Sequence, residues 1–370
     1  MLLAEIDYSE LLGKKVECIP GCGLCCLCQP EVLSDESAFF KKNHPTALVR
    51  NKYPEDHLAL ALKKGRGSCV FLNDRKCSVY SKRPTYCRQF PYHFHVGERI
   101  KVELDLSCRG AWTGNGVSAV DDVKPMVVAA ERRLMDALGE ASSVYREFYA
   151  NCKEAGVIGN PKEIRASVTG RITEFTDLKF IGNVMEASFE EPVMSLDSVI
   201  IKEIDMDELE DAARDAALGS MMSADPVSVP VYCDDGWNWN IFMASGNRIE
   251  WKIIDDDGDI HDKGRADPSD IPLMAPEPSG RGVLEDYIRI LNQRDSMLGN
   301  TFYMMDEWGY EDDMANTYYG AISVTVLDLM WRASMLTHFV GTGTGAQGMR
   351  EAIIFYDMDR LDAPTIGAFV

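Results

Sequence analysis

The chain has 370 residues, enough for two domains that each bury a hydrophobic core without disulfide bonds. Its net charge of −21 is unevenly distributed, because residues 1–109 carry 17 basic and 13 acidic side chains and the acidic excess follows them. Such an acidic C-terminal region repels phosphates, so we expect no nucleic acid as a partner and predict that this region binds another protein.

The N-terminus and the apolar segments indicate where the protein works. The first residues have no basic segment, and acidic residues interrupt the apolar ones, so we expect no secretory signal peptide. The most apolar candidate for a membrane span, residues 322–340, contains Asp328, Arg332 and His338 and is typical of an amphipathic helix instead. We therefore predict a cytoplasmic protein without insertion into a membrane.

The first predicted elements are short loops and a hairpin. Residues 6–110 contain several turn-forming pairs, and residues 91–106 alternate between apolar and polar side chains around a turn at Gly97 and Glu98. His93 and His95 are spaced to share one face of this hairpin, which we expect to be solvated.

Helical and strand-like patterns alternate in the rest of the chain. Residues 121–155 follow helical spacing, with an expected break at Gly139, and residues 197–222 predict an acidic helix. Residues 226–263 predict antiparallel strands, and residues 267–282, rich in Pro, Ser and Gly, predict a loop or linker. Further helices are expected at 283–292, 314–339 and 348–361.

These elements predict an α+β fold in two parts. A small cysteine-rich metal-binding module, residues 1–115, is followed by a larger region of mixed helices and antiparallel strands, residues 116–370, here called the C-terminal region. Residues 267–282 are a candidate for a further boundary within the C-terminal region.

The cysteines are concentrated in the module. Nine of the eleven lie between residues 18 and 108, whereas Cys152 and Cys233 lie outside. In a cytosolic chain, clustered cysteines are metal ligands or redox groups far more often than disulfides. Thiolates two residues apart on a tight turn can reach one metal together, and Gly21 and Gly23 allow the backbone to curl toward it.

The number of cysteines favours a cluster over a single ion. A tetrahedral zinc needs four ligands, and the module offers at least eight. The adjacent Cys25 and Cys26 suit one ion poorly, because neighbouring side chains diverge, but they suit a multi-iron cluster or two metals. The pattern therefore favours a [4Fe–4S] iron–sulfur cluster, with the other cysteines holding a second metal or bracing the first. Zinc and reduced structural cysteines are the alternatives, because soft thiolates suit both metals.

The same segments resemble the YkgJ-type CxxCxxCC cysteine-cluster family, which is described as zinc- or iron-chelating. Residues 69–72 read Cys-Val-Phe-Leu, and residues 77–91 read Cys-Ser-Val-Tyr-Ser-Lys-Arg-Pro-Thr-Tyr-Cys-Arg-Gln-Phe-Pro, and both follow the family pattern closely. The first run departs from it, since three residues rather than two separate Cys18 from Cys22, and Cys28 falls outside the pattern. The resemblance covers residues 16–110, under a third of the chain.

Candidate site residues follow from the module and this resemblance. The predicted metal ligands are Cys18, Cys22, Cys25, Cys26, Cys69, Cys77, Cys87 and Cys108. Arg83 and Arg88 match the motif and are candidates for cofactor binding, through charge-assisted hydrogen bonds to cluster sulfurs or to a carboxylate. Local ion pairs that fix the loop are the alternative role for these two arginines.

The resemblance implies metal binding but no settled reaction. The favoured function is a redox, electron-transfer or oxidoreductase role for an iron–sulfur protein. The alternatives are a zinc module that organises a complex and a protein-modifying enzyme resembling the lysine N-methylases that share a cysteine cluster of this general kind. No catalytic residue is predicted, and whether the protein is an enzyme stays open.

Overall fold

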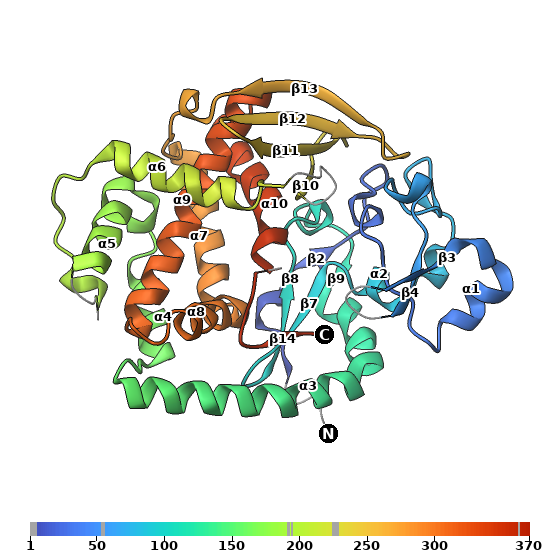
Figure 1. The fold of residues 1–370 in the computed structure, drawn as a ribbon, viewed down its shortest axis with the longest axis horizontal. Coiled ribbons are helices and arrows are strands. Elements are labelled where there is room, and N and C mark those ends of the chain that lie inside the picture. Colours follow the sequence, from blue (N-terminus) through green and yellow to red (C-terminus); the bar gives the residue numbers. More distant parts are fainter. Residues whose placement is uncertain (1–5, 53–55, 191–192, 194, 224–228, 362) are drawn as a thin grey trace.

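The computed structural model describes residues 6–52, 56–190, 193, 195–223, 229–361 and 363–370. Figure 1 shows the cysteine module on one side of the molecule, a group of helices on the other, and a four-stranded sheet across the top of both. The predicted α+β class is confirmed. The boundary at residue 115 stays a prediction, because residues from both sides of it share the largest apolar cluster.

The module is built from short elements around one hairpin. They are β1 (Ile6–Asp7), β2 (Lys15–Val16), α1 (Ser37–Asn43), β3 (Leu48–Asn51), β4 (His57–Leu60), β5 (Leu72–Asn73), β6 (Lys76–Cys77), α2 (Thr85–Gln89), β7 (Tyr92–Val96) and β8 (Ile100–Leu104). Just beyond the module, β9 (Val117–Ser118) pairs with β2. The predicted hairpin is β7 paired with β8, with Phe94 opposite Val102. Its sheet has the order β1-β8-β7-β14, so β14 (Ala368–Phe369) adds a strand from the far end of the chain.

The C-terminal region combines helices with the sheet seen at the top of Figure 1. The helices are α3 (Ala119–Ala155), α4 (Pro161–Gly170), α5 (Leu178–Glu190), α6 (Met206–Gly219), α7 (Pro278–Gln293), α8 (Asp295–Glu307), α9 (Met314–Val340) and α10 (Ala346–Leu361). The sheet joins β10 (Val231–Cys233), β11 (Trp239–Ser245), β12 (Arg248–Ile254) and β13 (Ile260–Ala266) in antiparallel order. In the described part of the chain, none of the helices is both long enough and apolar enough to cross a membrane.

Four local predictions are wrong. Helix α7 begins at Pro278, within residues 267–282 that were expected to form a loop or linker, because proline fits the first position of a helix. Helix α3 continues through Gly139, because its buried stripe carries on across the glycine from Leu134 to Ala141. Helix α6 begins only at Met206, where the Asp205 carboxylate accepts hydrogen bonds from two free backbone N–H groups. The hairpin face bearing His95 is covered instead of solvated, and this side chain is fully buried.

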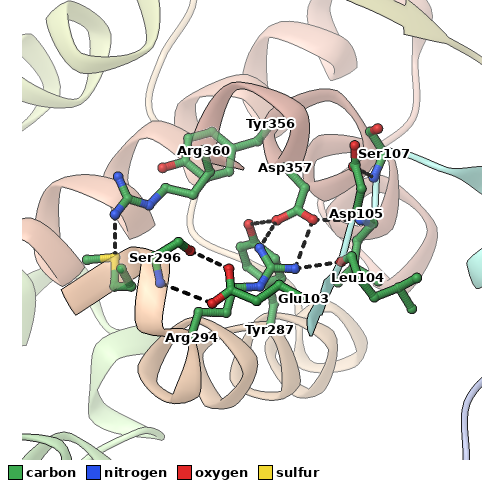
Figure 2. Close-up of polar contacts among 12 residues, drawn as sticks. Glu103, Leu104, Asp105, Ser107, Tyr287, Arg294, Ser296, Tyr356, Asp357 and Arg360 are labelled. Atoms are coloured by element: carbon green, nitrogen blue, oxygen red, sulfur yellow. Dashed lines mark hydrogen bonds and ion pairs between the residues drawn. The ribbon is translucent and has the colours of Figure 1, made fainter. Parts of the chain in front are cut away.

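A buried ionic network joins the module to the helices (Figure 2). Arg294, between α7 and α8, donates to the carboxylates of Glu10 and Asp357 and to the carbonyl oxygen of Leu104 in β8. Asp357 of α10 also accepts from the Tyr287 hydroxyl at 2.5 Å. Because the Arg294 side chain is fully buried, its charge is compensated by these partners alone within the described residues.

Candidate metal centre

One cavity of about 690 Å³ collects the module's cysteines. All nine cysteines between residues 18 and 108 line it, including the eight predicted ligands and Cys28. All eleven cysteines belong to the described residues, and none of them forms a disulfide bond. The segments that the sequence separates by up to 90 positions therefore meet at one place, although ligation by these thiols stays a prediction.

The charge of Cys25 affects most of the other thiols in this cavity. Its hydrogen bond with Cys26, followed by burial and the charges of Cys26 and Cys22, raises its pKa well above the usual value. Burial also raises the pKa of five further thiols, and the charge of Cys25 adds to the effect at each: Cys18, Cys69, Cys77, Cys87 and Cys108. Thiols packed this closely repel one another as thiolates, and a bound cation removes that repulsion.

The two motif arginines differ in position. Arg83 lies close enough to the thiols to oppose these effects, since its charge lowers the pKa of Cys18, Cys25 and Cys87, among others. Its guanidinium also stacks on the Tyr80 ring at 3.7 Å and donates to the Tyr80 carbonyl oxygen. Arg88 also lines the cavity, but it forms an ion pair with Glu36, 3.0 Å away. Arg83 thus faces the thiols, whereas Arg88 ties α2 to the residue that precedes α1.

The first cysteine run forms a tight turn that needs glycine. Gly21 and Gly23 have positive φ values of 97° and 63°, and a short 3₁₀ helix follows at Leu24–Cys26. A side chain at Gly23 would approach the Trp239 ring to 3.1 Å, and one at Gly21 would approach the Trp237 ring to 3.2 Å. The turn therefore presents its cysteines while its backbone packs closely against two tryptophans of the C-terminal region.

Residues of the C-terminal region thus support the first cysteine turn from behind, which the sequence did not reveal. The Trp239 indole donates to the Cys22 carbonyl oxygen at 2.9 Å, and Arg75 stacks on the same indole. Cys233, at the end of β10, lies with its Sγ atom 3.8 Å from that of Cys22. The sequence places Cys233 outside the cluster, because no local spacing connects it to the module. Only the pairing of β10 with β11 brings it there.

The Cys22–Cys233 contact changes the chemistry of both thiols. The hydrogen bond with Cys233 lowers the pKa of Cys22 to about 6, against burial, with help from the Leu24 backbone N–H and from Arg109. The same hydrogen bond, together with burial, raises the pKa of Cys233. Cys22 is therefore the thiol of this pair that carries the negative charge at neutral pH.

The cavity has the donors of a metal site but not a closed coordination sphere. Among the described residues, no group of three or more His, Cys, Asp and Glu side chains is arranged as a ready metal site. The donor set nevertheless fits a thiophilic metal, because nine soft sulfur ligands face one space beside a basic side chain. Metal binding would draw these thiols together and release their protons.

The fold and this cavity define an α+β protein with a thiol-lined candidate metal centre in its N-terminal part. Residues 17–109 match the CxxCxxCC family model, described as "Putative zinc- or iron-chelating domain", which confirms the resemblance seen in the sequence. The match ends before the C-terminal region. No curated protein and no solved structure matches the chain.

Proposed function

We propose that this chain is a cytoplasmic metal-binding protein whose cysteine module holds a [4Fe–4S] cluster and serves electron transfer. The observation that carries the proposal is the single cavity lined by nine thiols, Cys25 among them. A cluster takes each ligand at a different iron atom, so its cysteines lie farther apart than ligands that share one ion. Thiols spread around a wide cavity, with two of them adjacent in sequence, suit that arrangement.

The residues around the cavity have distinct tasks in this proposal. An iron–sulfur cluster supplies one-electron transfer at a potential set by charge, hydrogen bonds and solvent exposure. Arg83 offsets the negative charge of the thiolates, and the tight turn at Gly21 and Gly23 lets backbone approach the site. Module residues form most of the cavity lining, and two tryptophans pack behind the turn that carries Cys22 and Cys25.

A protein partner is the second part of the proposal. The C-terminal region carries 46 acidic and 21 basic side chains after residue 109, and such a surface attracts basic proteins at long range. An electron-transfer protein needs a transient partner, and charge steering gives fast association that weakens as salt rises. Association that is insensitive to salt would contradict this part.

The first experiment is metal and acid-labile sulfide analysis of protein purified without oxygen. We expect iron and sulfide in the wild type, their loss in Cys25→Ala, and wild-type content in Cys152→Ala. Cys152 is the matched control, because it is a buried thiol in α3 that does not line the cavity. Zinc without sulfide would overturn the redox function and favour a zinc module that organises a complex. A folded protein without either metal would overturn both.

A further inference from the structure

Cys233 is the one cysteine of the C-terminal region that reaches the module. It lies 211 positions after Cys22 in the chain and outside the residues that match the family model. Its side chain is fully buried and does not line the thiol-lined cavity, whereas Cys22 does. The two Sγ atoms are 3.8 Å apart.

This separation is the one that two ligands of a single metal ion adopt. At a metal–sulfur distance of about 2.3 Å, two thiolates on one tetrahedral zinc lie about 3.8 Å apart. At neutral pH the pair therefore needs to lose only the Cys233 proton, and its sulfurs need not move, in order to hold one ion between them. On the cavity side, Cys18 and Cys108 interact electrostatically with Cys22 and would have to move toward the ion to complete the four ligands, because no group of three ligands is preformed among the described residues.

The backbone carbonyl of each cysteine accepts a hydrogen bond from the other part of the chain: Cys233 from the module, and Cys22 from the C-terminal region. Arg109 donates through Nε to the Cys233 carbonyl oxygen at 2.5 Å, and its guanidinium forms a buried ion pair with Glu351 of α10. Trp239 fixes the Cys22 carbonyl oxygen from the other side. Ligands whose backbones are fixed in this way are positioned before the metal arrives, and the nearby Arg109 offsets the charge of two thiolates.

We propose that Cys233 is a further thiolate ligand, which shares one tetrahedral metal ion with Cys22 at the edge of the thiol-lined cavity. This inference rests on the proposed function, in that the module binds metal through thiolates. As the ion binds at neutral pH, Cys233 and each further thiol that completes the site release one proton to solvent, whereas Cys22 is already a thiolate, and the bound ion joins β10 to the Cys22 turn. Metal binding thereby fastens the C-terminal sheet onto the cysteine module, and the remaining cavity cysteines are left for the cluster.

The test is a titration of the reduced, metal-free full chain with cobalt(II), in the wild type, Cys233→Ala and Cys152→Ala. Cobalt occupies tetrahedral thiolate sites, and its sulfur-to-metal charge-transfer absorption grows with the number of bound thiolates. We expect Cys233→Ala to lose at least about tenfold in affinity for one ion and to lose charge-transfer absorption in proportion. Cys152→Ala should match the wild type in both.

A second measurement uses only the wild-type chain, so that a folding defect in Cys233→Ala does not decide the outcome. In moderate urea, bound cobalt should protect Cys233 from alkylation, as read by mass spectrometry of its peptide, and a chelator should abolish the protection. The inference would be overturned if Cys233→Ala bound cobalt with the affinity and absorption of the wild type. It would also be overturned if Cys233 were alkylated at the same rate with and without cobalt. Either result would leave Cys233 only its hydrogen bond with Cys22. A wild type that binds no cobalt, iron or zinc would overturn the proposed function as well.

Discussion

Replacing Arg294 by methionine removes the cation at the centre of the network in Figure 2. The side chain is fully buried and serves two carboxylates, Glu10 and Asp357, together with one carbonyl oxygen. Removing one partner of a buried ion pair costs about 3–5 kcal/mol, because the charge left behind is uncompensated. Asp357 keeps the Tyr287 hydroxyl and the Leu106 N–H at 2.6 Å, so we expect a loss within this range and not twice as large.

The assay is urea unfolding of the reduced chain, followed by circular dichroism and tryptophan fluorescence. The matched control is Arg132→Met, because the Arg132 side chain is 95% exposed and lies 3.9 Å from Asp136. We expect this control to change the free energy of unfolding by less than about 0.5 kcal/mol. A loss below about 1 kcal/mol for Arg294→Met, or one equal to that of the control, would refute the reasoning. Separate transitions for the two probes in the wild type would support the predicted boundary at residue 115.

Three further predictions concern the thiols and their turn. In the metal-free protein, the alkylation rate of Cys22 should rise with pH through a midpoint near pH 6, because the thiol is protonated below that pH and a thiolate above it. Cys233→Ala should raise this midpoint. A wild-type midpoint near the usual cysteine pKa of about 8.5 would contradict the Cys22–Cys233 contact. Arg83→Gln should raise the pKa of the neighbouring thiols and weaken metal binding at pH 7 by about tenfold. Competition with a chelator measures this affinity. An unchanged affinity would show that Arg83 has only a structural role. Gly23→Ala should lower the free energy of unfolding in urea by about 1–3 kcal/mol, and by more than Gly13→Ala. Both glycines have positive φ, but only the new Cβ at Gly23 would lie 3.1 Å from the Trp239 ring. Equal losses for the two variants would show that the contact with Trp239 is unimportant.

The local patterns of the sequence predicted the elements whose formation depends on neighbours in the chain. The β7–β8 hairpin follows from alternation around Gly97, and α9 follows from its long apolar periodicity with an N-terminal boundary predicted at Met314. The metal module was recognisable for the same reason. Its cysteines are placed by short loops, so their spacing along residues 17–109 is itself the signal that the family model matches.

Tertiary structure decided the features that depend on contacts between distant segments. Gly139 did not end α3, because burial on both sides of the glycine outweighed the small cost of a glycine within a helix. The burial of His95 and the network of Arg294 arise from helices that pack on the hairpin. The position of Cys233 beside Cys22 depends on the pairing of β10 with β11 and on the contact of Trp239 with the Cys22 turn. Neither interaction produces a recognisable residue spacing in the sequence around Cys22. Sequence periodicity indicates which residues of one element share a face, whereas the support behind the Cys22 turn comes from strands about 200 residues away in the chain.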